Sequence, residues 1–313
     1  MPGIITVFGA TGQQGGGVID AIKQHPTLSA VYRIRGVTRD RSRPDLRRDI
    51  EWVEADLNDP KSVCAAMTGS DTVFASTNFW ESMSSDTEVQ QGKNVADAAK
   101  SSGVRHLIWS SLPAIADISA GNIKHALHFD SKAQVQRYIE GIKHGSFIST
   151  HVMAGAFMQN FDRLIKGGIG QDRVMAYPWD ESQTRVPLVD ATTDVGIYVA
   201  AVFSLGLRFP TTVDGESFQA VAEWLSPRQM VRIMSEVAGQ PCHYSEVTLE
   251  QFKVSMPQTI ADEIGDTVRL VREYEYYGQG AESRQAEDDR LLGLDAGCKS
   301  TWEDYVRRLR SCE

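Results

Sequence analysis

Short apolar runs alternate with longer amphipathic stretches through the first half of the chain. The apolar runs are typical of buried strands, and they predict six strands, at residues 4–8, 32–37, 51–54, 72–75, 106–109 and 147–153. Helical periodicity fills most of the gaps, with one helix expected over 60–67 after the N-cap Asp59, and another over 87–101. Strands that alternate with helices favour a parallel sheet with right-handed crossovers. We therefore expect an α/β fold in which this half forms a Rossmann, doubly wound parallel sheet.

The pattern changes after about residue 155, where the apolar runs become less regular. The remaining signals are strand-like pieces near residues 185–189 and 217–223, and helix starts at Thr192, Ser226 and Thr248. They predict a smaller C-terminal α+β lobe over the carboxyl edge of the sheet, where such folds bind ligands. The expected boundaries are 1–155 for the Rossmann domain and 156–313 for a substrate- or partner-binding lobe interleaved with it.

The C-terminal region gives two further predictions. Residues 273–292 contain three tyrosines, two glycines and many charged side chains, a composition that predicts a mobile surface segment. A last short helix is expected to begin near Thr301, because its hydroxyl and the carboxylate of Asp304 have the spacing of a capping box.

The charge balance and the apolar content narrow the classes of partner. The chain has 32 Lys and Arg against 41 Asp and Glu, a net charge of −9 over 313 residues. This acidity disfavours direct binding to nucleic acid or to an anionic membrane. No apolar run approaches the roughly 18 residues of a membrane span, and the N-terminus enters a strand without a basic flank. We therefore expect a soluble protein of the cytoplasm, with the nucleus left open as a second compartment.

The cysteines and histidines do not form a pattern typical of metal sites. No CxxC pair and no His at metal-ligand spacing accompanies the four cysteines, Cys64, Cys242, Cys298 and Cys312. His125 and His128 lie three residues apart, but a helical pair of this kind without a carboxylate in reach is a poor set of zinc ligands. We expect reduced thiols and no metal site.

A glycine-rich loop carries the most specific chemical signal. It directly follows the first predicted strand and opens the first helix, and it reads Gly9, Ala10, Thr11, Gly12, Gln13, Gln14, Gly15. In a GxxGxxG loop of this placement, the first glycine permits the tight turn, the second lets backbone approach a pyrophosphate, and the third lets helix and strand pack closely. The alternative is a glycine-rich turn without a ligand. Gly16 and Gly17 extend the run, and the sequence offers no account of them.

The end of the second strand predicts which dinucleotide is bound. An acid there would pair with the ribose hydroxyls of NAD, whereas an Arg accepts the 2′-phosphate of NADP. Arg39 holds this position and Arg43 follows closely, which favours NADP(H) over NAD(H). A solvated charge cluster is the alternative, and the neighbouring Asp40 weakens the inference. Asp56 and Leu57, after the third strand, are expected to flank the adenine, although Asp56 is also a common turn residue.

Together these residues resemble the NmrA-like family, an atypical branch of the short-chain dehydrogenase/reductase superfamily. The shared segments are GATGxQG at 9–15, VTR at 37–39, TNFWE at 77–81, HFDSK at 128–132, and FMQN at 157–160. The TNFWE and HFDSK segments are most similar to vertebrate-type NADPH sensors; other relatives are fungal nitrogen-repression regulators and reductases. The resemblance implies that six side chains surround the ribose and nicotinamide of NADP(H): Thr77, Asn78, Phe79, Lys132, Phe157 and Asn160. One departure is Gln90, where the sensors carry a Lys.

The catalytic pattern of the wider superfamily is incomplete in this chain. Its members use a Tyr and a Lys four residues apart on one helix face. Here Lys132 is present, but the position four residues before it is His128. A His titrates near neutrality and is able to donate a proton, and Ser110 or Ser111 after the fifth strand would steady a carbonyl oxygen. The alternative is that His128 packs against the cofactor and Lys132 only binds its ribose, with no chemistry.

Two hypotheses follow, and the sequence leaves open whether the chain is an enzyme. The first is a dinucleotide-responsive, redox-sensing regulator of transcription that acts through protein partners; the missing Tyr favours it. The second is an NADPH-dependent oxidoreductase that reduces a carbonyl, enone or imine of a small metabolite. Trp80, Trp179 and Trp224 are expected to line a ligand cleft or to pack in the core. A homodimer is a further open possibility.

Overall fold

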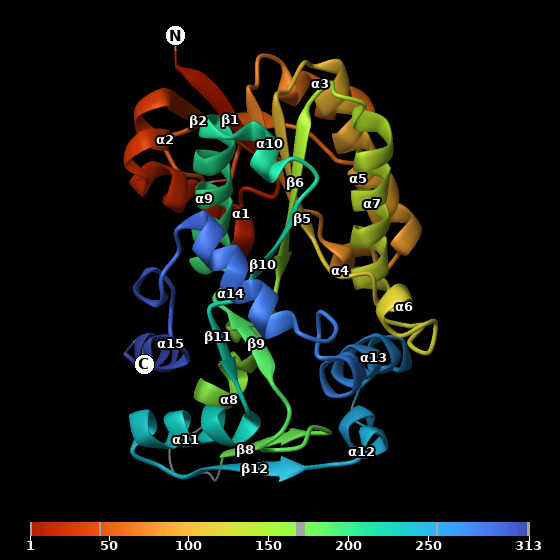
Figure 1. Cartoon of the computed structure of the whole chain (residues 1–313), viewed down its shortest axis with the longest axis vertical. Coiled ribbons are helices and arrows are strands. Elements are labelled where there is room, and N and C mark those ends of the chain that lie inside the picture. The colour runs from red at the N-terminus through yellow and green to blue at the C-terminus, as the bar shows by residue number, and fades with distance from the viewer. Residues whose placement is uncertain (1, 44, 167–172, 255, 312–313) are drawn as a thin grey trace.

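Seven parallel strands form the central layer of the molecule in the computed structural model, which describes residues 2–43, 45–166, 173–254 and 256–311 (Figure 1). Their order across the sheet is β10-β6-β5-β4-β1-β2-β3, and every neighbouring pair is parallel. The strands are β1 (Gly3–Val7), β2 (Tyr32–Thr38), β3 (Glu51–Glu54), β4 (Thr72–Ala75), β5 (His106–Ser111), β6 (Ile148–Ala154) and β10 (Ser217–Ala220). The predicted Rossmann fold class is confirmed.

Helices cover both faces of this sheet, which explains why its central strands read as continuous apolar runs. All residues of β4 and β5 are buried, as expected for strands packed on two sides. One face is covered by α1 (Gln13–Gln24), α2 (Pro26–Val31), α9 (Asp194–Arg208) and the short α10 (Pro210–Val213). The other face is covered by α3 (Pro60–Met67), α5 (Ser85–Ser101) and α7 (Leu127–Lys143).

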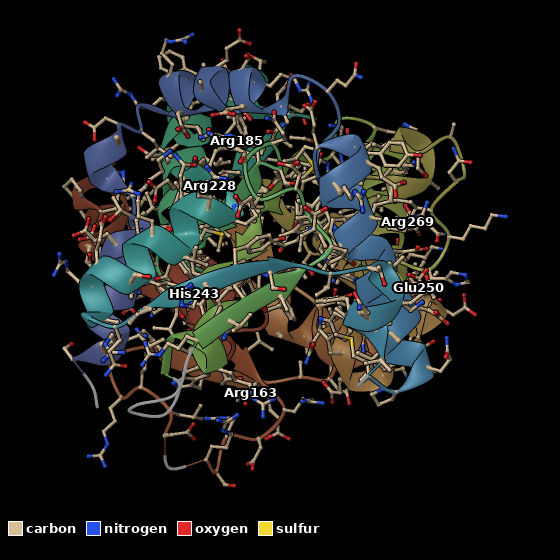
Figure 2. All side chains as sticks on the ribbon, turned by 90° about the horizontal axis from the view of Figure 1, so that it is seen from below. Arg163, Arg185, Arg228, His243, Glu250 and Arg269 are labelled. Carbon is tan, nitrogen blue, oxygen red and sulfur yellow. The ribbon has the colours of Figure 1, made fainter. Side chains whose placement is uncertain are left out.

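The second half of the chain contributes two small sheets at the carboxyl edge of the large one. Their orders are β11-β9-β7 and β12-β8, with β7 (Ala156–Phe157), β9 (Val186–Val189), β11 (Glu223–Leu225), β8 (Arg173–Tyr177) and β12 (Cys242–Glu246). The segment expected as one strand at 217–223 is therefore divided between the large sheet and a small one. Figure 2 shows β8 and β12 side by side, with helices on both flanks.

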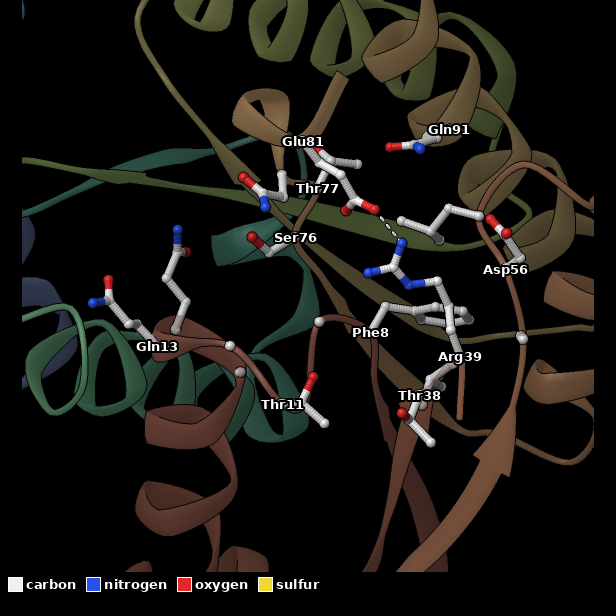
Figure 3. Close-up of a pocket in the computed structure, with 18 of the residues that line it drawn as sticks. Phe8, Thr11, Gln13, Thr38, Arg39, Asp56, Ser76, Thr77, Glu81 and Gln91 are labelled. Atoms are coloured by element: carbon white, nitrogen blue, oxygen red, sulfur yellow. Dashed lines mark hydrogen bonds and ion pairs between the residues drawn. The ribbon is translucent and has the colours of Figure 1, made fainter. Parts of the chain in front are cut away.

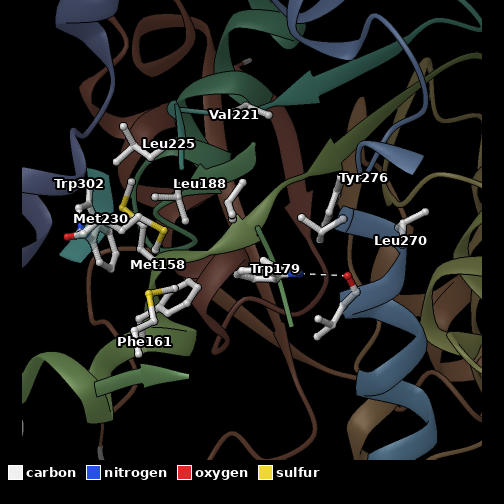
Figure 4. Packing of buried hydrophobic residues seen from close by; sticks show 14 of the residues in the cluster. Met158, Phe161, Trp179, Leu188, Val221, Leu225, Met230, Leu270, Tyr276 and Trp302 are labelled. Atoms are coloured by element: carbon white, nitrogen blue, oxygen red, sulfur yellow. Dashed lines mark hydrogen bonds between the residues drawn. The ribbon is translucent and has the colours of Figure 1, made fainter. Parts of the chain in front are cut away.

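Helices of this second half pack around a core of their own. They are α8 (Asp162–Lys166), α11 (Pro227–Ala238), α12 (Leu249–Lys253), α13 (Gln258–Tyr274), α14 (Ala281–Leu292) and α15 (Trp302–Arg310), with 3-10 turns η1 (Met158–Phe161) and η2 (Ala296–Cys298). Two more short helices, α4 (Phe79–Ser82) and α6 (Ile115–Ile118), lie at the junction with the large sheet. Figure 4 shows the core, in which Trp179 donates from Nε1 to the carbonyl of Val268 at 3.0 Å.

Side-chain caps fix several helix starts that the sequence predicted. Asp59 accepts a hydrogen bond from the amide of Lys61 at the start of α3. Ser226, Thr248 and Thr301 each form a capping box at the start of α11, α12 and α15. These predicted starts are confirmed because the cap is a local interaction that three or four residues determine on their own.

The prediction of a mobile surface segment at 273–292 is wrong. Helix α13 extends to Tyr274, and α14 occupies most of the rest. Between them Tyr276 and Tyr277 are buried, and their hydroxyls donate to the carbonyls of Ala154 and Met153 at 3.1 and 2.9 Å. The tyrosine rings therefore anchor the segment to the end of β6, while its charged side chains, which suggested mobility, are mostly on the outer face of α14.

Helices α1 and α9 approach each other closely, which explains why residue 17 is a glycine. A Cβ atom at Gly17 would lie 2.5 Å from the carbonyl oxygen of Thr192, and one at Gly196 would lie 2.2 Å from the carbonyl oxygen of Gly17. Both distances are far below van der Waals contact, and both obstacles are backbone. Only glycine permits this packing of α1 on α9.

No helix in the described part of the chain combines the length and apolar character needed to cross a membrane. The thiols of Cys64, Cys242 and Cys298 are free, and Cys312, the fourth expected thiol, lies outside the described residues.

Replacing Gly17 with Ala is expected to lower the free energy of unfolding by about 1–3 kcal/mol, because backbone would have to move to relieve the overlap. Urea unfolding of the purified variant measures this. Gly16→Ala is the matched control, since a Cβ there meets nothing within 4 Å. It should leave stability unchanged or raise it by up to about 1 kcal/mol, because Ala favours a helix. Equal losses in both variants would contradict the explanation by close approach.

Candidate functional site

The glycine-rich loop has the backbone geometry that a pyrophosphate requires. Gly9 has a φ of +72°, and its carbonyl accepts the amide of Gly12 at 2.9 Å. A Cβ at Gly15 would lie 2.2 Å from the carbonyl oxygen of Gly9, so the turn can close only with glycine there. No side chain caps α1 within the described residues, which leaves its first amides and its positive dipole end facing the loop. These features fit a bound phosphate group.

A cavity of about 430 Å³, here named the loop cavity, opens in front of this turn at the carboxyl edge of the sheet (Figure 3). The loops after β1, β2, β3 and β4 form its walls. Twelve of the expected cofactor residues line it: Gly9, Thr11, Gly12, Gln13, Gln14, Gly15, Arg39, Asp56, Leu57, Thr77, Asn78 and Phe157. Residues from four separate loops thus converge where a dinucleotide was expected.

Other expected residues lie elsewhere. Phe79, Lys132 and Asn160 line a second cavity described below. Ala10 packs in the core and Arg43 is ion-paired with Asp45, and neither lines the loop cavity. Their expected contacts with a cofactor remain predictions.

Five polar residues of the loop cavity were not among the expected cofactor residues: Thr38, Asn58, Ser76, Glu81 and Gln91. Gln90, which stands where the NADPH sensors carry a Lys, directly precedes Gln91. Gln90 donates to Asn94 at 2.9 Å, whereas Gln91 reaches the cavity and donates to Asn58 at 3.1 Å. Adjacent positions on a helix face directions about 100° apart, so the two glutamines have different surroundings although they are neighbours in the sequence.

An ion pair crosses the loop cavity. Arg39 projects from the end of β2 and donates to the carboxylate of Glu81 in α4, as the dashed line in Figure 3 marks. The hydrogen bond to Glu81 raises the pKa of Arg39 above its usual value. The side chains are 62% and 51% exposed, so the pair contributes only about 0–1 kcal/mol. A ligand phosphate at this place would compete with Glu81 for the guanidinium.

The second cavity, here named the aromatic cavity, has a volume of about 710 Å³. It shares Gln14, Thr77, Asn78 and Phe157 with the loop cavity, so the two adjoin. Its walls are rich in aromatic rings, contributed by Phe79, Trp80, Phe129, Phe157, Phe161, Tyr177, Trp179, Phe252 and Tyr276. Trp80 and Trp179 line this cleft, whereas Trp224 donates to Gln285 at 3.2 Å outside it.

Lys132 enters this region as one half of a buried ion pair. Its Nζ contacts the carboxylate of Glu88, and the two side chains are 8% and 1% exposed. Glu88 also accepts from the hydroxyls of Ser131 and Thr77, the latter at 2.7 Å. The carboxylate of Glu88 therefore neutralises the ammonium and satisfies both hydroxyls. No sequence pattern predicted this partner, because α5 and α7 are separate elements.

His128 and the two serines line the same cavity. The Nδ1 atom of His128 contacts the carboxylate of Glu263 from α13, and its ring packs on Phe129 with centroids 4.5 Å apart. Ser111 donates to Gln136 at 2.7 Å, and Ser110 donates to Gln14 at 2.6 Å. The three predicted catalytic residues His128, Lys132 and Ser111 therefore line one cavity.

Within the described residues, no group of three or more His, Cys, Asp or Glu side chains is arranged to hold a metal ion. The geometry offers a phosphate-binding turn, a cationic fork beside it, and a hydrophobic chamber with a histidine at its wall.

The chain has relatives of known sequence and structure along nearly all of its length. The sequence model of the NmrA-like family matches residues 1–306. An NmrA-like family domain-containing oxidoreductase of a Cladobotryum species is 28% identical over 262 residues, which cover 78% of this chain and 76% of the relative.

Solved structures share the fold. The negative transcriptional regulator Nmra in complex with NADP has a TM-score of 0.78 at 22% identity, covering 98% of this chain and 94% of its own. The NADPH-dependent quinone oxidoreductase QOR2 of Escherichia coli, complexed with NADPH, has a TM-score of 0.73 at 18% identity, covering 98% and 99%. At these identities the likenesses establish the shared fold alone.

Replacing Lys132 with Met is expected to destabilise the protein by about 3–5 kcal/mol, because it leaves the carboxylate of Glu88 buried without its cation. The double variant Lys132→Met/Glu88→Gln should recover most of this loss, since the buried charge is then absent. Urea unfolding measures both. Lys61→Met, at the exposed start of α3, is the control and should change stability by less than about 0.5 kcal/mol. Failure of the second substitution to restore stability would contradict the charge-compensation argument.

Proposed function

The chain belongs to the NmrA-like family, and from that premise we propose that it is an NADPH-dependent reductase of a flat, uncharged small molecule. One observation carries the proposal: the aromatic cavity adjoins the loop cavity and has His128, Lys132 and Ser111 in its wall. A protein that only binds a dinucleotide would need the loop cavity and the adjoining part of the aromatic cavity, where the residues expected around the nicotinamide ribose lie, but it would not need the rest of this larger cavity. A chamber of this size with few polar groups is typical of a small-molecule site.

The lining favours an aromatic or conjugated substrate without charge. Of the charged side chains in the wall, Lys132 is paired with Glu88 and His128 with Glu263, and Arg163 is exposed. A buried charge on the substrate would therefore lack a partner and would cost several kcal/mol. Stacked rings such as Tyr177 and Trp179, 4.4 Å apart, offer flat apolar walls. A carbonyl, enone or imine conjugated to a ring system fits this description.

Different residues of the chain would have different roles in the reduction. When bound, NADPH supplies a hydride to the electrophilic carbon of the substrate and becomes NADP⁺. His128 would donate a proton to the oxygen or nitrogen that gains negative charge. Ser111 would hold that atom by turning its hydroxyl from Gln136 to the substrate. The rings of the aromatic cavity would keep water from the reacting atoms, which would strengthen both interactions. Thr77 lines both cavities and accepts a hydrogen bond from Nζ of Lys132 at 3.5 Å, and the nicotinamide ribose would be held there.

Arg39 supports the preference for NADP(H) over NAD(H). Its guanidinium lines the loop cavity at the end of β2 and lies close to Asp56 at the expected adenine edge. A planar guanidinium suits the 2′-phosphate. Glu81 is half exposed and forms a weak pair with Arg39, so a doubly charged phosphate should displace it.

A dinucleotide-responsive regulator that acts through protein partners is the second candidate, and the ion pair between Arg39 and Glu81 favours it. Displacement of Glu81 by a 2′-phosphate would release one end of α4, which also carries the 44%-exposed ring of Trp80. A ligand that binds one conformation of α4 better shifts the population toward it. The surface around Trp80 would then report the NADP(H) state to a partner in the cytoplasm or nucleus.

Arg39→Ala is expected to weaken NADPH binding about 10- to 100-fold, the loss of one or two charge-assisted hydrogen bonds. NADH lacks the 2′-phosphate, so its affinity should change less than about threefold. Fluorescence titration with each dinucleotide measures both. Arg41→Ala removes the same charge from an exposed position outside the loop cavity and should leave both affinities unchanged. An equal loss for NADPH and NADH would contradict a contact with the 2′-phosphate.

The test of the reductase proposal is oxidation of NADPH, followed at its absorbance band, with pairs of conjugated carbonyl compounds that differ only by an added carboxylate. The neutral member of each pair should be reduced and the charged member should not. His128→Asn keeps a side-chain donor for Glu263 but lacks the second ring nitrogen. It should lower turnover about 10²-fold or more while NADPH affinity is retained. NADPH binding without oxidation across the neutral compounds would instead favour the regulator.

A further inference from the structure

Helix α13 presents a buried acid to the histidine of the aromatic cavity. We propose that Glu263 is a positioning residue, which holds the imidazole of His128 in one tautomer and directs its Nε2 atom to the substrate. This inference rests on the proposed reductase function, since it assigns a partner to the proton donor of that reaction. Glu263 lies 135 residues away from His128 in the sequence, and no motif identified it.

The contacts of Glu263 fix both the backbone and the ring of His128. Its Oε1 atom accepts the amide of His128 at 2.9 Å and also contacts Nδ1 of the ring. The side chain of Glu263 is 4% exposed and that of His128 is 13% exposed. An ionised carboxylate only accepts hydrogen bonds. The Nδ1 atom must therefore carry the hydrogen, and any change of protonation occurs at Nε2.

The packing of the imidazole leaves its Nε2 atom on the side of the aromatic cavity. Phe79, Trp80 and Phe129 surround the imidazole, with centroids at 5.8, 5.0 and 4.5 Å. With Nδ1 turned to α13, Nε2 is on the other edge of the ring, and His128 lines the aromatic cavity. Nε2 has no hydrogen-bond partner among the described residues. It is thus the ring atom left for a substrate.

The charges around His128 suit a proton donor. The carboxylate of Glu263 balances the imidazolium before the transfer, as the buried acid of a His–acid pair does. Lys132 lies one turn further along α7. Its ammonium repels the imidazolium only weakly, because the carboxylate of Glu88 neutralises it. In the reaction the Nε2–H bond breaks, the substrate oxygen or nitrogen gains the proton, and Nδ1–H remains bonded to Glu263. Solvent then returns a proton to Nε2.

A second acid on the same helix gives a matched comparison. Asp266 lies one turn after Glu263 and is also buried. It accepts the amides of Lys124 and His125 at 3.0 and 2.8 Å, so it anchors the segment just before His128. It has no contact with the imidazole among the described residues. If Glu263 had only a structural role, replacing Glu263 and replacing Asp266 would have the same effect on the tautomer of His128 and on kcat.

The experiment compares Glu263→Gln with Asp266→Asn in the full-length protein, with two readouts. The first is the tautomer of His128, read from the nitrogen shifts of its imidazole by NMR and assigned with His128→Asn. At a pH at which the ring is neutral, wild type and Asp266→Asn should have the Nδ1–H form, and Glu263→Gln should give a mixture, because a glutamine amide both donates and accepts. The second is turnover. Glu263→Gln should lower kcat about 10- to 100-fold, with KM and NADPH affinity within about twofold of wild type.

The two readouts separate the possible failures. If both variants keep the Nδ1–H tautomer and lose kcat equally, Glu263 is structural and the proposal is overturned. A tautomer that changes only in Glu263→Gln supports the positioning role even when no tested compound is reduced, in which case the reductase function itself fails. Should Glu263→Gln not fold, Glu263→Asp retains the carboxylate, and a kcat loss with an unchanged Nδ1–H signal would support the proposal, whereas an unchanged kcat would overturn it.

Discussion

The reversal of strand order beside β1 is the constraint on which both cavities depend. β1 pairs with β2 on one side and with β4 on the other, and the helices that connect these strands cover opposite faces of the sheet. The loops that leave β1 and β4 therefore diverge at the carboxyl edge, and a crevice opens between them. The glycine-rich turn lies at this crevice because it directly follows β1. The second half of the chain then adds the walls of the aromatic cavity to the same edge.

Closing that edge with a lobe imposes a second constraint, because polar groups of the sheet edge become buried. Two basic side chains in the wall of the aromatic cavity are each met by an acid from another element: Lys132 in α7 by Glu88 in α5, and His128 by Glu263 in α13. Removing one partner from such a pair costs far more than the pair contributes. Compensation therefore leaves the chamber apolar in character even though charged residues line it. The same compensation explains why a neutral ligand suits the chamber better than a charged one.

The sequence predicted the elements of the first half well because their signals are local. The third and fourth strands coincide with 51–54 and 72–75, and the cap at Asp59 is present as expected. The glycine-rich loop and Arg39 were found for the same reason. The segment 273–292 was misjudged because the burial of Tyr276 and Tyr277 depends on carbonyls at the end of β6, more than 100 residues earlier. Glu88 and Glu263 were not predicted for the same physical reason: the sequence does not show whether a glutamate is buried or exposed, since this depends on residues far along the chain.

Helix α4 contacts both cavities, which relates the two candidate functions. Glu81 on this helix pairs with Arg39 in the loop cavity, while its neighbour Trp80 packs on His128 with centroids 5.0 Å apart. If a dinucleotide at Arg39 and a ligand beside His128 favour the same position of α4, each strengthens the binding of the other, because such coupling is reciprocal. A reductase would use this coupling to complete its substrate site only when NADPH is present. A regulator would use the same coupling to alter the surface around Trp80. The two proposed functions would thus differ in what occupies the aromatic cavity, and both would use the same coupling through α4.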